Sequence, residues 1–124
     1  MYRLTIKGEL IDLNNYTKAN RKNKYYANKI KQDTEDYIVW HIKEQLKDLK
    51  IDKQVQLNYT WYCKDKRKDK DNIAFAQKFV QDAMVKSGLL INDGWNNIAG
   101  FTHEFKIDKE CPKIEIELVE VENE

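Results

Sequence analysis

The stretch "QVQLNYTWYC", residues 54–63, carries the clearest indication of the fold. Its apolar side chains occupy every second position, at Val55, Leu57, Tyr59, Trp61 and Cys63. Because successive side chains of a strand point to opposite faces of a sheet, this alternation predicts a strand that is buried on one face. We therefore expect a β-sheet that includes this stretch.

Three other stretches alternate in the same way. They are residues 2–7 within "MYRLTIKG", residues 98–107, and "KIEIELVEV" at residues 113–121. The turn "DKECP" separates the last two stretches and predicts that they form an antiparallel hairpin.

A first helix is predicted over residues 34–49, with a start that can lie earlier. Ile38, Ile42 and Leu49 fall on one helical stripe, and Asp33 or Thr34 is the expected N-cap. The polar segment before it, residues 8–24, predicts a loop.

A second helix is predicted over residues 72–87, with Asn72 as its N-cap and Gly88 at its C-terminal end. The expected order is β-α-β-α-β-β, which predicts an α+β fold: a small mixed β-sheet with two main helices packed on it. At 124 residues the chain has the length of one ordinary domain, so residues 1–124 are expected to form a single domain.

Composition excludes several classes of protein. Charged residues make up 35% of the chain, and no apolar run is long enough for a membrane span or a signal peptide, so we expect a cytoplasmic protein. Cys63 and Cys111 lack the spacing of a zinc site and are expected to be reduced thiols in or near strands. His41 and His103 lie within apolar patterns and are expected to be packed side chains.

Net charge is only +1, but the charge is unevenly distributed. Residues 18–31, "KANRKNKYYANKIK", hold six cations and no acid. With the adjacent Tyr25 and Tyr26, this basic arm predicts contact with a nucleic-acid backbone; the alternative is a solvated, partly mobile loop. The expected DNA-binding residues of the arm are Lys18, Arg21, Lys22 and Lys24.

The stretch "KDKRKDKDN", residues 64–72, holds five cations and three carboxylates. Asp69 and Asp71 stand two apart before the second helix, where an extended backbone would aim both side chains the same way. This suits a metal site, although acids before a helix are also common as caps. The cations beside them are expected to contact DNA: Lys66, Arg67, Lys68 and Lys70.

Two residues further along could complete a catalytic site. Lys78 follows Asp71 by about two helical turns, with Asp82 one turn beyond and within its reach, and Asp93 lies in the loop after the helix. Three carboxylates and a lysine suffice for magnesium-assisted phosphodiester hydrolysis. An EF-hand is excluded, because no glycine occupies the sixth position of any candidate loop.

The run "DKDNIAFAQKFVQDAMVKSGLLIND", residues 69–93, resembles the signature of the RusA family of Holliday junction resolvases. The "NNY" at residues 14–16, followed by a basic segment, is similar to the asparagine-rich loop of that family. The resemblance covers nearly the whole chain and implies a RusA-like fold.

The resemblance also implies an activity. Members are small bacterial and phage-borne endonucleases that act as homodimers and use magnesium, with manganese as a substitute, to nick opposing strands of a four-way DNA junction. Their catalytic, metal-binding aspartates correspond to Asp69, Asp71 and Asp93, and their essential lysine corresponds to Lys78.

Two departures from the family pattern bear on the site. The spacing from Asp71 to Lys78 is three residues longer, which rotates the lysine by about 60° on an ideal helix. Asn92 stands where an aspartate is usual, which weakens metal binding only if that position is a ligand.

The leading prediction is thus a magnesium-dependent endodeoxyribonuclease that resolves branched DNA, with no small-molecule cofactor and no membrane partner. A homodimer is expected, through an alternating strand such as residues 113–121 or a helix face with Trp40. The alternatives are a catalytically inactive DNA-binding or regulatory protein on the same fold, and a charged structural domain without a nucleic-acid role.

Overall fold

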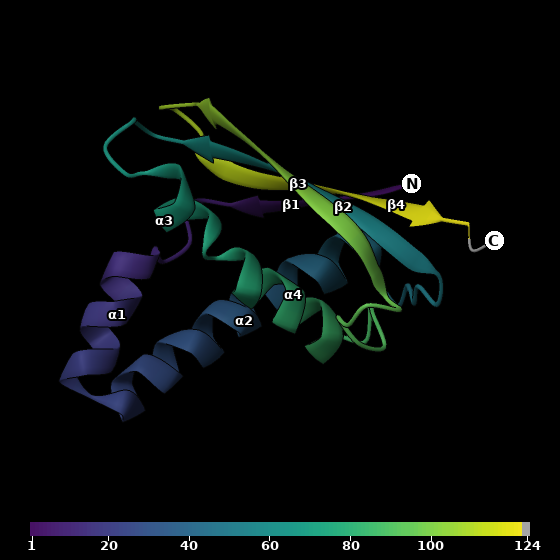
Figure 1. Ribbon diagram of the computed structural model, residues 1–124, viewed down its shortest axis with the longest axis horizontal. Coiled ribbons are helices and arrows are strands. Elements are labelled where there is room, and N and C mark those ends of the chain that lie inside the picture. The colour runs from purple at the N-terminus through teal and green to yellow at the C-terminus, as the bar shows by residue number, and fades with distance from the viewer. Residues whose placement is uncertain (123–124) are drawn as a thin grey trace.

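The computed structural model describes residues 1–122. Its elements are β1 (Tyr2–Lys7), α1 (Leu13–Lys22), α2 (Lys24–Leu46), β2 (Gln54–Cys63), α3 (Lys70–Ala74), α4 (Gln77–Lys86), β3 (Ile98–Ile107) and β4 (Lys113–Val121). The strands form one mixed sheet, and the helices lie against one of its faces (Figure 1). The predicted α+β class and mixed sheet are confirmed.

The order of strands in the sheet is β1-β4-β2-β3, with β2 and β3 parallel and the other pairs antiparallel. The predicted hairpin of β3 and β4 is therefore wrong, because β4 inserts between β1 and β2. Alternation shows which face of a strand is buried but does not select its neighbours. The connection crosses the end of β2, where the Asp108 N–H donates to the Cys63 carbonyl at 2.8 Å.

The core lies between the sheet and the helices α2 and α4. Along β2 every second side chain is buried, as its alternation predicts. Leu57 and Tyr59 are fully covered and belong to the same apolar core as Phe79 and Val80 of α4. The sheet thus has one apolar face under helices and one polar, open face.

Residues 13–22 form helix α1, so the predicted loop over residues 8–24 is wrong. The Asp12 side chain caps α1 by accepting from the Asn15 N–H at 2.8 Å. Its apolar stripe is short: Ala19 is buried, and the Tyr16 ring lies 5.3 Å from that of Phe79. The helix is strongly polar on average and has few apolar side chains, which is why its sequence predicted a loop.

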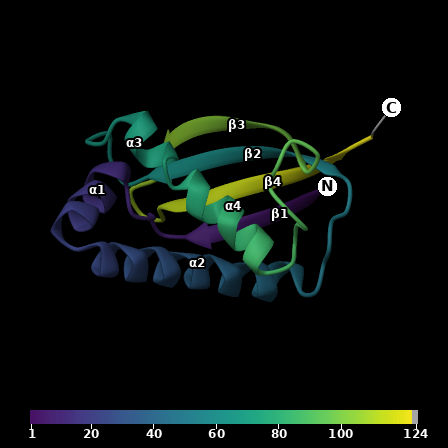
Figure 2. The same cartoon turned by 60° about the horizontal axis from the view of Figure 1, so that its bottom comes forward.

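Helix α2 begins at Lys24, ten positions before the prediction, and ends at Leu46, before the predicted residue 49. Thr34 is not a cap but an interior residue, whose hydroxyl donates to the Ile30 carbonyl at 2.7 Å. The predicted stripe of Ile38 and Ile42 is buried and faces the core. The helix reaches well past the sheet at its N-terminal end (Figure 2).

The second predicted helix is divided into α3 and α4. Asn72 lies inside α3 rather than at its N-cap, which is Asp69. At the division, the Phe79 N–H bonds to the Ala76 carbonyl at 3.0 Å, a tightened i to i−3 contact. Gly88 follows α4 with φ +83, as predicted for a glycine at a helix C-terminus.

No helix within residues 1–122 is both long enough and apolar enough to cross a membrane.

Candidate active site and nucleic-acid interface

An open pocket of about 640 Å³ lies where the parallel strands β2 and β3 end, next to α3. It is lined by three carboxylates, four lysines and a set of apolar side chains: Asp65, Asp69, Asp71, Lys66, Lys68, Lys70, Lys106, Cys63, Ile73, Phe105 and Ile107. The carboxyl ends of parallel strands are a usual position for ligand sites. This one combines oxygen ligands for a cation with positive charge for a polyanion.

Asp69 and Asp71 are brought together by the start of α3. Asp69 is the N-cap, with extended dihedrals, and its carboxylate makes no capping hydrogen bond. Asp71 lies in the first turn, where its Oδ1 accepts from the Asn72 N–H at 3.0 Å. Both side chains are exposed toward solvent. Two accessible carboxylates fit magnesium, which takes one or two such ligands and leaves other positions for water and phosphate.

The N-terminal end of α1 holds this acidic segment in place. Asp12, only 3% exposed, pairs with Lys68 at 2.9 Å and also accepts from the Asn15 side chain. The Asn14 N–H donates to Asn72 Oδ1 at 2.9 Å. The asparagine-rich stretch near residue 14 therefore holds the start of α1 against α3, which lines the pocket.

Asp12 and Lys68 each favour the charged form of the other. Burial disfavours charge on Asp12, but hydrogen bonds from Asn15 and Lys68 outweigh it and lower the pKa of this carboxyl. The hydrogen bond to Asp12 raises the pKa of Lys68. Because Asp12 already compensates its charge, Lys68 is less available to DNA than Lys66 and Lys70, which line the same pocket.

Lys78 is not among the residues that line the pocket. It projects from α4, 66% exposed, and its Nζ lies 3.2 Å from Asp82, as the helical spacing predicts. Lys70 lies nearer the acids, with its Nζ 5.8 Å from the centre of the Phe105 ring. Lys106 enters the pocket from β3; sequence reasoning missed it, because only the parallel pairing with β2 reveals its position.

Asp93 lies at the opposite end of the sheet from Asp69. Its loop is anchored where β2 and β3 begin, since the Val55 N–H donates to the Asn97 carbonyl at 2.9 Å. From there to the pocket the strands run about 25 Å, at 3.3 Å per residue. Figure 2 shows the loop after α4 at one end and α3 at the other. One chain therefore does not bring the three aspartates together.

The described residues also lack a ready-made cluster of metal ligands. Within residues 1–122, no three His, Cys, Asp or Glu side chains are grouped so that they could hold a metal ion. Asn92 turns toward the backbone, where its Oδ1 accepts from the Asp93 N–H at 2.8 Å.

The basic arm is a helical hairpin rather than a loop. Asn23 separates α1 from α2, and the cations project around this tip: Lys18, Arg21, Lys22 and Lys24. None of these four has an ion-pair partner in the described part of the chain, whereas Lys29 and Lys31 further along α2 pair with acids. The tip lies on the same side of the molecule as α3 (Figures 1 and 2). Arg67, also on that side, is 89% exposed and lies 3.6 Å from Asp65.

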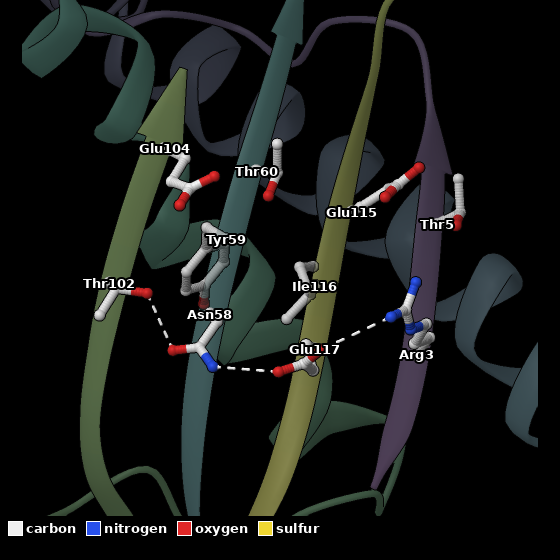
Figure 3. Close-up of a pocket in the computed structure, with 10 residues that line it drawn as sticks. All are labelled: Arg3, Thr5, Asn58, Tyr59, Thr60, Thr102, Glu104, Glu115, Ile116 and Glu117. Carbon is white, nitrogen blue, oxygen red and sulfur yellow. Dashed lines mark hydrogen bonds and ion pairs between the residues drawn. The ribbon is translucent and has the colours of Figure 1, made fainter. Parts of the chain in front are cut away.

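The open face of the sheet carries an acidic hollow, with Lys106 and Lys113 over the Tyr62 ring nearer the pocket end of the same face. The hollow is lined by Glu104, Glu115 and Glu117, with Arg3 as the cation among its lining residues (Figure 3). Arg3 lies 3.7 Å from Glu117, which also accepts from the Asn58 side chain at 3.3 Å. Such a surface repels phosphate, so it is a poor candidate for a DNA interface.

Both histidines are packed side chains, as predicted. His41 Nδ1 lies 2.8 Å from the Tyr37 carbonyl. His103 Nδ1 accepts from the Trp61 indole N–H at 2.9 Å, and its Nε2 lies 2.9 Å from the Gln77 side-chain oxygen. Burial lowers the pKa of His103, which favours the neutral ring that this bonding requires.

Both cysteines are free thiols, as predicted. Cys63 ends β2 and lines the pocket, where burial raises its pKa. Cys111 is exposed in the turn before β4.

Comparison with protein families identifies the family of this chain. The family model described as Endodeoxyribonuclease RusA matches residues 11–119, a range that includes the pocket, the hairpin and the Asp93 loop. No individual curated protein matches the chain.

Proposed function

The chain belongs to the RusA family of endodeoxyribonucleases, which resolve Holliday junctions, and we propose that it cuts four-way DNA junctions by paired, symmetric nicks in the presence of magnesium. In this proposal residues 1–124 act as one RusA-like endonuclease domain. The observation that carries it is the pocket in which Asp69 and Asp71 lie among lysines, on the same side of the molecule as the basic hairpin.

Within the pocket, Asp69 and Asp71 would hold the ion. When bound, magnesium supplies positive charge beside a phosphate oxygen and lowers the pKa of the water that it binds. Manganese, which takes similar oxygen ligands, would substitute for it. Lys66 and Lys70 would bind the phosphates that flank the cut, and Lys18, Arg21, Lys22 and Lys24 would bind the backbone further away.

Lys78 remains the lysine that we propose to stabilise charge on the reacting phosphate. Lys78 is the exposed end of its ion pair with the half-buried Asp82, and pairs near the surface contribute about 1 kcal/mol or less. A phosphate near α4 could therefore compete for the ammonium at little cost. Lys70 is the alternative, because it already lines the pocket.

A homodimer would resolve the separation of the aspartates. The outer edge of β3 has no neighbouring strand among residues 1–122, and Phe101 and Ile107 on this strand are 52% and 47% exposed. An unpaired edge with apolar side chains is a template for another strand. By contrast, β4 is paired on both sides and cannot offer an edge.

Antiparallel pairing of two β3 strands about a two-fold axis would lay the start of one strand beside the end of the other. The partner's Asp93 would then approach Asp69 and Asp71 from across the interface. Each dimer would carry two such composite sites, which matches the two cuts that resolution of a junction needs.

A mixing experiment tests the function and the composite site together. Wild-type protein should cleave a synthetic four-way junction with magnesium and fail to do so in a chelator. Asp71→Asn and Asp93→Asn should each be inactive alone, but their mixture should recover nicking, because some dimers then hold one intact site. Recovery of a single nick per junction, without the paired cut, would be the specific signature.

Two other results would count against parts of the proposal. Activity of Asp93→Asn alone would remove this residue from the site, and failure of the mixture would place all three acids in one chain. No cleavage by the wild type, together with tight junction binding, would favour the second candidate, an inactive DNA-binding protein. The observation that favours an inactive DNA-binding protein is the distance between Asp93 and the pocket within one chain.

A further inference from the structure

The tip of the α1–α2 hairpin presents two aromatic rings to solvent. Tyr25 is 81% exposed and Tyr26 is 54% exposed. The two rings are not equivalent. Tyr26 lines a groove between the helices together with Ile11, Ala19 and Ile30, so it contributes to packing. Tyr25 is not among the residues of that groove, and its exposure leaves its ring without a role in the fold.

The backbone beneath Tyr25 is rigidly held. Asn23 Oδ1 accepts from the Tyr25 N–H at 2.8 Å and from the Tyr26 N–H at 3.4 Å. The Asn23 N–H donates to the Ala19 carbonyl, and its own carbonyl accepts from Ala27, which is buried. A ring on such a tip loses little conformational freedom when it binds, because its backbone is ordered beforehand.

The surroundings of Tyr25 indicate the chemistry of a partner. Residues 13–32 contain no carboxylate, and the cations nearest in sequence to the tip, Lys22 and Lys24, have no ion-pair partner within residues 1–122. Exposed aromatic rings among unpaired cations are how proteins bind nucleic acid whose bases are accessible for stacking. A continuous duplex offers no such base, because its faces are covered by neighbours.

We propose that Tyr25 stacks on a base at the branch point of the junction and thereby makes the protein select branched DNA over duplex. Tyr25 is a positioning and specificity residue in this scheme, separate from the acids that cut. The inference rests on the proposed function, since it names the part of the substrate that the hairpin recognises.

The fold also sets where the cut should fall. Helix α1 begins at the Asn14–Asn72 hydrogen bond beside the acids and runs ten residues to the tip. That length is about 15 Å, which corresponds to about four nucleotides along a strand at 3.4 Å each. We therefore expect cleavage within about five nucleotides of the branch point.

The test measures binding to an immobile four-way junction and to a linear duplex of the same arm sequence, in a chelator so that neither is cut. Replacing Tyr25 by Ala, Leu or Phe gives a matched series: Leu keeps apolar bulk without a π-face, and Phe keeps the ring. Junction affinity should fall about ten- to a hundredfold in Tyr25→Ala and Tyr25→Leu, as expected for one lost base stack, and stay near the wild-type value in Tyr25→Phe. Duplex affinity should not change in any of them.

A fluorescent 2-aminopurine placed at the branch point gives a second readout. It should be quenched by wild-type protein and by Tyr25→Phe, and it should not be quenched by Tyr25→Ala. Equal loss of junction and duplex affinity in Tyr25→Ala, or an unchanged preference for the junction, would overturn the role of Tyr25 while leaving the nuclease proposal intact. A wild-type protein without preference for the junction would overturn both.

Discussion

Two polar surfaces flank the same sheet, and they carry opposite charge. At the carboxyl ends of β2 and β3, lysines surround Asp69 and Asp71, and the basic hairpin projects on the same side. A hollow on the open face of the sheet instead gathers Glu104, Glu115 and Glu117 around Arg3 (Figure 3). With a net charge of only +1, the chain segregates its charges rather than accumulating one sign. In the proposed complex, DNA approaches from the side of the pocket and the hairpin.

The largest effect is expected for Asp71→Asn. Loss of one carboxylate should lower junction cleavage by at least about a thousandfold, since the ion that neutralises the reacting phosphate loses a ligand. Junction binding should persist or improve, because a negative charge facing phosphate is removed. Cleavage is measured on a labelled junction and binding by gel shift in a chelator. Near-normal nicking by this variant would move the catalytic centre away from the pocket.

Lys78→Ala and Lys70→Ala form the next comparison. If Lys78 stabilises charge on the phosphate, its removal should reduce turnover by about a hundred- to a thousandfold, while Lys70→Ala mainly weakens binding. The fold should hold in both variants, because both side chains are on exposed helix surfaces. Single-turnover kinetics separates the two effects. The reverse order of effects would assign the catalytic role to Lys70, and a fall in thermal stability in Lys78→Ala would mark Lys78 as a structural partner of Asp82.

The strands, and the place of Asp69 and Asp71 beside the second helix, were predictable from local sequence because their signals repeat at short range. The alternation from Val55 to Cys63 indicated the buried face. Asp69 and Asp71 line one pocket, but only Asp69 has the extended backbone that the prediction assumed for both, because Asp71 lies in the first turn of α3. The Lys78–Asp82 pair likewise follows from helical spacing alone. Each of these features depends on residues fewer than ten positions apart.

What the sequence could not predict depends on distant residues. Helix α1 is strongly polar, so its sequence read as a loop, and Asp12 and Asn72 hold it from outside its own span. The place of β4 between β1 and β2 depends on pairing across more than fifty residues. The separation of Asp93 from the pocket follows from the parallel arrangement of β2 and β3, which no local pattern encodes.

Asp12→Ala tests whether the hairpin is fixed relative to the pocket. The variant loses the cap of α1 and leaves Lys68 without its acid, which should lower the free energy of unfolding by about 2 kcal/mol. Because the folded-state pKa of Asp12 is lowered, its stabilisation is present above the ordinary aspartate pKa and is lost as pH falls through the lower folded value. Denaturant unfolding at several pH values measures both. Asp12→Asn, which keeps a cap, should lose less, and equal losses in the two variants would contradict a capping role.

Lys22→Ala combined with Lys24→Ala should weaken binding to all DNA shapes by about tenfold at moderate salt. The slope of log affinity against log salt should fall by about one unit per lost phosphate contact. This uniform loss contrasts with the junction-specific loss expected at Tyr25. An unchanged affinity and an unchanged slope would mean that the hairpin is a solvated surface with no role in DNA binding.

The smallest effect is expected on the open face, and a null result there is informative. Glu104→Gln combined with Glu115→Gln removes two negative charges without altering an ion pair within residues 1–122, since the pair on this face joins Arg3 to Glu117. If DNA lies on the helix-bearing side, these carboxylates do not face it, and 0.1 M salt screens their charge with a Debye length of about 10 Å. Junction affinity and cleavage should then stay within about twofold of the wild type at that salt. A rise in affinity of tenfold, with a steeper salt dependence, would mean that phosphate contacts the open face, and the contrast between the two surfaces would no longer locate the DNA.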